Sequence, residues 1–195
     1  EVAGVDAFRA FAQSFGQRLL GYEFGSTPRS LVGAGVYSST EYPAHQSIPL
    51  HNEQSYTSTW PLRIWFYCPL PSREGGETPI ADSRLVYRRI PERIRQRWAE
   101  RGLMYVRNYG GGLDVPWPEV FNTSDRREVE AYCRAHGITC EWKSDGELRT
   151  RQVCQAVAQH PRSGDWVWFN QAHLFHVSAL APELREVLLD AVSPE

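Results

Sequence analysis

The run from Pro61 to Cys68 constrains the fold of this chain more than any other segment. It reads Pro-Leu-Arg-Ile-Trp-Phe-Tyr-Cys, and its aromatic and apolar residues predict a buried β-strand. Similar composition predicts further strands at Leu103–Tyr109, Ile138–Trp142, Leu148–Val157 and Trp166–Phe169. Apolar spacing and capping residues predict helices at Val5–Leu20, after Asp82 or Ser83, at Pro91–Gly102, at Ser124–His136 and at Pro182–Val192. This mixture predicts a sheet-rich α+β domain, with the jelly roll as one candidate architecture.

Length, charge and cysteine content limit the class of protein. The 195 residues suffice for one domain with a real core, and the net charge of −2 argues against a nucleic-acid binder. No apolar run reaches the roughly 20 residues of a membrane-spanning helix, and no signal peptide is visible. The four cysteines form no Cys-x-x-Cys pair, which disfavours disulfides and a zinc site and suits a reducing compartment. We therefore expect a cytoplasmic protein.

The tripeptide His51-Asn52-Glu53 is the main candidate for chemistry. On an extended segment, residues two positions apart point to the same face, so His51 and Glu53 would lie side by side. An imidazole and a carboxylate make most of a metal site, and a second His would complete the facial triad that holds Fe(II). A chain with this many His and acidic residues contains about 0.7 such pairs by chance, so the surrounding sequence has to support the assignment.

That support comes from residues 49–89, which resemble the taurine dioxygenase-like (TauD/TfdA) family of Fe(II)/2-oxoglutarate-dependent oxygenases. The matching residues are the His-x-Glu pair, Gly75-Gly76 in the expected turn, and Thr78. Two later blocks, at 140–150 and 160–170, resemble the family in the same order. The resemblance implies that His51 and Glu53 bind iron and that Thr78 lies beside 2-oxoglutarate. It also implies a distorted double-stranded β-helix, the jelly roll of this family, with flanking helices.

The implied activity is hydroxylation of an amino acid or a small natural-product intermediate, either free or bound to a peptidyl carrier protein. The products would be a hydroxylated substrate, succinate and carbon dioxide. Glu53 argues against a halogenase, because halogenating relatives replace this carboxylate with a small residue. In the family, a distal His and an Arg that pairs with 2-oxoglutarate follow a helix like the one predicted at Pro182–Val192. We therefore interpret residues 1–195 as a single domain, incomplete at its C-terminus, that lacks these final strands.

Several other residues flank the matching segments and are candidates for the substrate pocket. They are Gln54, Tyr56, Asn170 and His173, and ordinary packing or hydrogen bonding is the alternative for each. His45 and His136 are interpreted as surface or capping residues. Two other functions stay open: a non-catalytic jelly-roll binding module, and a zinc-dependent hydrolase that uses His51, Glu53 and His173 with a metal-bound water.

Overall fold

A computed structural model describes residues 2–16, 18–22, 24–25, 29–40, 47–110 and 115–191. The chain divides into two compact units. Unit 1 comprises Glu1–Ile48, Thr59–Ile80 and Val106–Gln152, and unit 2 comprises Pro49–Ser58, Ala81–Tyr105 and Val153–Glu195. Helices and small sheets both occur, which confirms the α+β class. The described sheets have two or three strands each, and the jelly roll stays a prediction.

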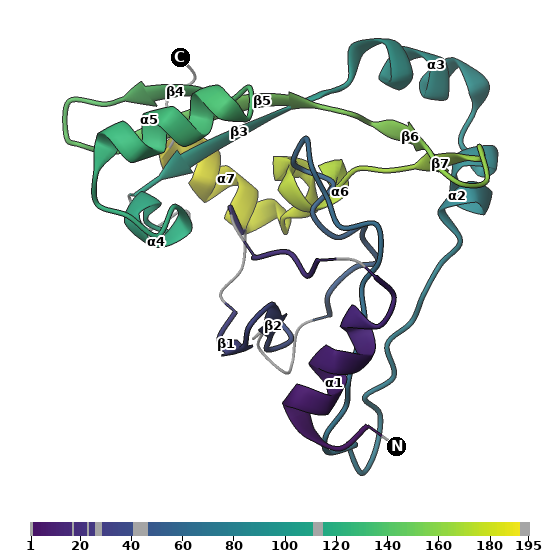
Figure 1. Cartoon of the computed structure of the whole chain (residues 1–195). Helices are drawn as coiled ribbons and strands as arrows, with labels where there is room; N and C mark the ends of the chain where they lie inside the picture. Colours follow the sequence, from purple (N-terminus) through teal and green to yellow (C-terminus); the bar gives the residue numbers. More distant parts are fainter. Residues whose placement is uncertain are drawn as a thin grey trace. The chain divides into compact units, whose positions relative to one another are not determined.

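The sheet of unit 1 has three strands in the order β3-β5-β4 (Figure 1). The strands are β3 (Leu103–Tyr109), β4 (Thr139–Trp142) and β5 (Leu148–Cys154). Strands β4 and β5 are antiparallel, with Thr139 opposite Arg151 and Trp142 opposite Leu148. Helix α5 (Arg126–Ala135) packs along this sheet, and its Val129 and Cys133 are fully buried. Alternation along β5 sends Leu148 into the same core. The first residues of β3 and the last of β5 are assigned to unit 2.

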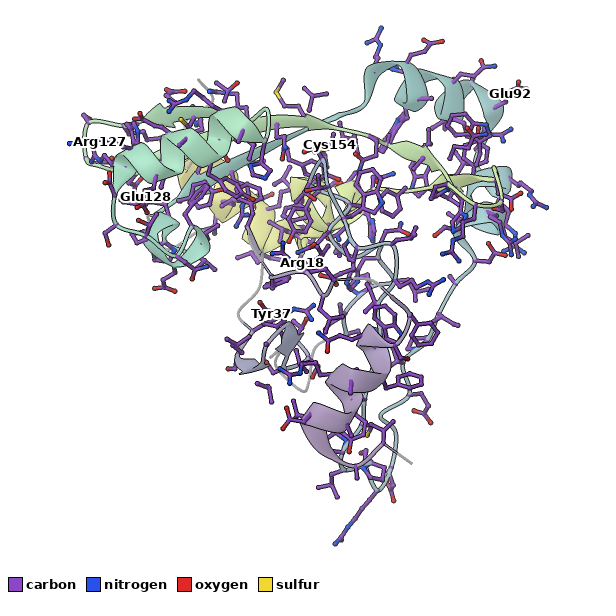
Figure 2. The ribbon with its side chains drawn as sticks, viewed as in Figure 1. Arg18, Tyr37, Glu92, Arg127, Glu128 and Cys154 are labelled. Carbon is purple, nitrogen blue, oxygen red and sulfur yellow. The ribbon has the colours of Figure 1, made fainter. Side chains whose placement is uncertain are left out.

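The start of α5 corrects one prediction by a single residue. The cap is Asp125, whose carboxylate accepts a hydrogen bond from the Arg127 backbone N–H at 2.8 Å, and not Ser124. The Thr123 hydroxyl accepts from the Asp125 N–H at 3.1 Å and donates to the Glu128 carboxylate. Figure 2 shows Arg127 and Glu128 in the first turn of α5. Thr123 thus extends the cap, and the helix begins one residue later than predicted.

The predicted buried strand at Pro61–Cys68 is wrong. This segment pairs with no other strand among the residues that the structure describes. Its side chains alternate between two environments. Trp65 contacts Phe15, and Tyr67 stacks on Phe8 of α1 (Gly4–Gln13), whereas Phe66 is 74% exposed. The aromatic composition therefore reflects packing of one face of the segment on α1 and on Phe15 just beyond it.

The remaining elements of unit 1 are short. They are the hairpin of β1 (Leu31–Gly33) and β2 (Val36–Tyr37), and helix α4 (Trp117–Val120). Helix α1 ends at Gln13 and not at Leu20 as predicted. A buried arginine, Arg107, lies over the rings of Phe24 and Tyr109, at 4.9 Å from each ring centroid. This cation–π stacking lets a charged side chain lie within an aromatic core.

Unit 2 contains the antiparallel hairpin of β6 (Val157–Gln159) and β7 (Trp166–Trp168). Its helices are α2 (Ser83–Arg89), α3 (Glu92–Arg101), α6 (Ala172–Phe175), the 3₁₀ turn η1 (Val177–Ala179) and α7 (Pro182–Ala191). Helix α2 lies against β7 (Figure 1), and Tyr87 of α2 stacks on Trp166 of β7. Asp82 caps α2, and α3 ends at Gly102, as predicted. None of the described helices is long and apolar enough to cross a membrane.

The predicted strand Leu148–Val157 is divided in two, because β5 ends at Cys154 and β6 begins at Val157. Gln155, between them, donates its side-chain amide to the carbonyls of Ser55 at 2.8 Å and Thr57 at 3.4 Å. The Cys154 thiol donates to the Tyr56 carbonyl at 3.3 Å. At this interruption, Cys154 and Gln155 therefore hydrogen-bond the segment 55–57 to the rest of unit 2. This segment follows the His-x-Glu pair directly.

Candidate metal site

His51 and Glu53 lie in unit 2, and their side chains converge. Nε2 of His51 is 3.6 Å from Oε2 of Glu53, and the two side chains are 28% and 23% exposed. The convergence matches the expectation that residues two positions apart share one face. The two residues lie in a segment that forms neither a helix nor a β-strand. Residues 49–52 are irregular, and residues 53–56 form a turn.

The orientation of the His51 ring is set by a backbone carbonyl. Nδ1 lies 2.8 Å from the carbonyl oxygen of Pro49. A carbonyl can only accept, so Nδ1 carries the proton, and in the neutral ring the Nε2 lone pair is directed toward Glu53. A backbone carbonyl on the distal nitrogen is the arrangement that fixes the tautomer of metal-binding histidines.

The separation of the two donor atoms fits a shared divalent ion. Bonds from imidazole and carboxylate to zinc are about 2.1 Å, so two donors on one such ion lie roughly 3.0 to 4.2 Å apart, depending on the angle. The observed 3.6 Å falls in this interval and exceeds a normal hydrogen bond. Within the described ranges, no group of three or more His, Cys, Asp or Glu side chains could hold a metal. The pair therefore presents two donor atoms of the kinds that bind a divalent ion.

A tight turn follows the pair and places Gln54 and Tyr56. The Ser55 N–H donates to the Asn52 carbonyl at 3.2 Å, and Gln54 adopts a left-handed φ of 55° within this turn. Tyr56 is almost fully buried, and its ring packs against Tyr105 and Phe175. Gln54 is half-buried beside the pair, whereas Tyr56 lies in the core beneath it. Their proposed roles as substrate contacts stay predictions.

Asn170 and His173 belong to the same unit and make hydrogen bonds to the backbone. The Asn170 amide donates to the Ala156 carbonyl at 2.8 Å and accepts from the Ala172 N–H at 3.1 Å, and this residue is buried. His173 directs Nε2 at the carbonyl of Leu50, at 2.9 Å. His173 therefore lies next to the ligand segment, and its Nε2 bonds to backbone instead of facing the pair. Substrate contact stays a prediction for both residues.

Thr78 is in unit 1, where it is exposed. It follows Gly75 and Gly76, which have positive φ values of 67° and 86°. The structure has a bend at residues 73–74, and the turn predicted at Gly75-Gly76 is not formed. The position of Thr78 beside 2-oxoglutarate stays a prediction. Of the two histidines interpreted as surface or capping residues, His136 is the C-cap of α5, and its Nδ1 bonds to the Tyr132 carbonyl. His45 lies outside the described residues.

A charged cluster lies at the start of α2. The Arg84 guanidinium is 2.8 Å from the Asp82 carboxylate and 3.5 Å from that of Asp165. Hydrogen bonds from Arg84 lower the pKa of Asp82 to about 2. The pKa of Asp165 is also lowered, first by the Ser163 hydroxyl and then by Arg84. The ion pair between Asp82 and Arg84 therefore also includes Asp165 of the β6–β7 hairpin.

Three residues that the sequence pattern did not indicate hold the ligand segment. The Asn52 amide donates to the Trp168 carbonyl at 3.1 Å and accepts from the Ser83 hydroxyl at 3.0 Å. The Gln171 side chain donates to the Asn52 carbonyl. The sequence does point to Asn52, because this residue stands between the two candidate ligands His51 and Glu53. Nothing in the sequence predicts that Ser83 and Gln171, 31 and 119 residues away, reach it.

This α+β domain directs an imidazole and a carboxylate at one point. These are two of the three ligand groups in the two-His, one-carboxylate site that is typical of non-haem iron proteins. The family model described as "Taurine catabolism dioxygenase TauD, TfdA family" matches residues 2–193, and the chain belongs to this family. The family resemblance inferred from residues 49–89 is thereby confirmed, over nearly the whole chain.

Two named proteins are similar to this chain in sequence. The chain is 44% identical over 170 residues to the dapdiamide synthesis protein DdaC of Enterobacter agglomerans, across 87% of this chain and 52% of that protein. It is 34% identical over 180 residues to the clavaminate synthase-like protein At3g21360 of Arabidopsis thaliana, across 87% of this chain and 54% of that protein. The chain spans about half the length of the curated relatives it matches.

Proposed function

We propose that this chain supplies the iron-ligand pair of an Fe(II)/2-oxoglutarate-dependent dioxygenase. The observation that carries the proposal is the convergence of His51 Nε2 and Glu53 Oε2 at 3.6 Å, with His51 Nδ1 held by the Pro49 carbonyl. Membership in the TauD, TfdA family supports Fe(II) and 2-oxoglutarate as cofactors and a double-stranded β-helix as the fold of the active protein.

In this function each residue has a distinct task. His51 and Glu53 hold the metal ion, and Thr78 hydrogen-bonds to 2-oxoglutarate. The Pro49 carbonyl keeps the His51 proton on Nδ1, so that Nε2 is the coordinating atom. When bound, the iron with 2-oxoglutarate and oxygen supplies oxidation of an unactivated C–H bond, with succinate and carbon dioxide as co-products. The protein orients the ligands and the substrate.

The proposed substrate is an amino acid or a small natural-product intermediate, free or tethered to a peptidyl carrier protein in the cytoplasm. The printed names of both relatives support a biosynthetic role, since one is a dapdiamide synthesis protein and the other is clavaminate synthase-like. Glu53 supports hydroxylation over halogenation, because its carboxylate would bind the metal where a halogenating relative would need room for a halide.

The proposal is tested by the visible spectrum of the full-length gene product under anaerobic conditions. Ferrous ion with 2-oxoglutarate should give a weak charge-transfer band, and the His51→Ala variant should lose it. The His160→Ala variant is the matched control, because His160 lies in the exposed β6–β7 turn and accepts from backbone N–H groups there. An unchanged band in His51→Ala would remove this residue from the mechanism.

Two other outcomes of the same preparation would favour a different function. A protein that binds the substrate and forms no succinate would be the non-catalytic binding module. Stoichiometric zinc with activity in the absence of oxygen would indicate the zinc hydrolase. The hydrolase requires His173 as the third ligand, and the bond from its Nε2 to the Leu50 carbonyl argues against this.

A further inference from the structure

Asn52 is fixed at both ends of its side-chain amide. Nδ2 donates to the Trp168 carbonyl at the end of β7, and Oδ1 accepts from the Ser83 hydroxyl in the first turn of α2. Because the Trp168 backbone carbonyl can only accept a hydrogen bond, the Asn52 amide has one favourable orientation. The side chain therefore joins the ligand segment to two separate elements of unit 2.

The backbone carbonyl of Asn52 is equally engaged. It accepts hydrogen bonds from the N–H of Ser55 at 3.2 Å, from the hydroxyl of Ser55 at 2.9 Å and from the buried side-chain amide of Gln171. The bond to the Ser55 N–H closes the turn in which Glu53 is the second residue. The direction of the Asn52 carbonyl therefore fixes the position of the Glu53 backbone from which the carboxylate side chain extends.

The rest of the segment is held in the same way. The Pro49 carbonyl accepts from His51, and the Leu50 carbonyl lies 2.9 Å from Nε2 of His173. In a paired strand these carbonyls would bond to a neighbouring backbone. Here side chains satisfy them, so the position of the segment depends on particular donor residues. Asn52, which stands between the two candidate ligands, acts through both its side chain and its carbonyl.

We propose that Asn52 is the positioning residue that sets the separation of the two metal ligands, an inference that rests on the proposed function. The two hydrogen bonds of the Asn52 amide, to Trp168 and Ser83, restrict rotation of the backbone on either side. His51 precedes it and Glu53 follows it, so a change at Asn52 moves both donor atoms. Residues that orient metal ligands from outside typically change metal affinity by about 10- to 100-fold when mutated.

The test is an anaerobic titration of the full-length gene product with ferrous ion alone, read by calorimetry, with the melting temperature measured in parallel. Asn52→Asp keeps the shape of the side chain but directs an acceptor at the Trp168 carbonyl. It should weaken ferrous binding by about 10-fold or more. Ser83→Ala removes only the second anchor and should weaken binding less. Gln159→Glu is the control, because it removes an amide-to-carbonyl bond to Gly164 in the same unit.

The outcomes separate this inference from the function on which it rests. If His51→Ala binds ferrous ion as tightly as the wild type, the proposed function itself fails. If His51→Ala loses affinity while Asn52→Asp retains it, or shows only a lower melting temperature, the positioning role is wrong. Should Asn52→Asp not fold, Ser83→Ala decides alone, and wild-type affinity in that variant overturns the inference. Gln159→Glu should bind as the wild type does.

Discussion

Backbone carbonyls, and not other side chains, hold most of the residues around the ligand pair. His51, His173 and Asn170 each direct a side-chain nitrogen at a main-chain oxygen, at 2.8, 2.9 and 2.8 Å. A main-chain acceptor is present whatever the sequence, so such a contact depends on the donor residue alone. Substituting one of these donor residues should therefore be enough by itself to remove the contact and shift the segment.

Tyr105 is a buried residue whose titration should affect stability. It is buried, its hydroxyl accepts from the Gln171 N–H at 3.0 Å, and burial raises its pKa from 10.0 to about 12. A raised pKa in the folded state gives stability that is complete below pH 10 and is lost as the pH rises toward 12. Tyr105→Phe should flatten the fall in the free energy of unfolding over this interval, measured by urea denaturation. An identical slope in both proteins would contradict this.

Thr78 provides a separate test of the cofactor assignment. If its hydroxyl hydrogen-bonds to 2-oxoglutarate, Thr78→Val should require several-fold more 2-oxoglutarate to half-saturate the anaerobic charge-transfer band, since one such bond contributes about 0.5–1.5 kcal/mol. Ferrous binding without 2-oxoglutarate should be unchanged. Thr59→Val, at another exposed threonine of unit 1, is the control. Equal half-saturation in Thr78→Val and wild type would remove Thr78 from the cofactor site.

Among the elements, the core of the β3-β5-β4 sheet should respond most to truncation. Leu148 is completely buried at the start of β5, and Leu148→Ala should lower the free energy of unfolding by about 2–5 kcal/mol, because it leaves a cavity. Val153 on the same strand is exposed, and Val153→Ala should change it by less than about 0.5 kcal/mol. Equal losses in the two variants, in urea unfolding, would show that the strand is not buried as described.

Removing the N-terminal cap of α5 should lower the free energy of unfolding less than Leu148→Ala does. Asp125→Ala removes the acceptor for the Arg127 N–H and should cost about 1 kcal/mol of stability. Ser124→Ala should cost much less, because Ser124 is not the cap. Thermal unfolding of both variants distinguishes the two positions. A larger loss in Ser124→Ala would restore the cap that the sequence alone predicts.

The elements also show where sequence reasoning reaches its limit. Capping and stop residues located α2, α3 and α5 to within a residue or two, because these signals act over one turn of the chain. Aromatic composition at 61–68 predicted a strand, but a strand also needs a hydrogen-bonding neighbour, and composition does not specify one. The break at Gln155 depends on carbonyls 98 and 100 residues away, a contact that no local pattern contains.

For the whole molecule, the sequence was sufficient for the family and for the convergence of His51 and Glu53, whose role as metal ligands stays a proposal. The spacing of His51 and Glu53 predicted their convergence, and the family model matches residues 2–193. The framework around the pair was not predictable, since Ser83 and Gln171 reach Asn52 only through the tertiary fold. The chain spans about half the length of its curated relatives, and its substrate and partners therefore stay proposals.

The most direct measurement of the central claim is a double-mutant cycle for ferrous binding, with His51→Ala, Glu53→Ala and the double variant titrated anaerobically by calorimetry. If the imidazole and the carboxylate coordinate one ion, each single variant should lose most of the affinity, and the double variant should lose little more. Losses that simply add, or a single variant that binds as tightly as the wild type, would show that the two side chains do not share a metal ion.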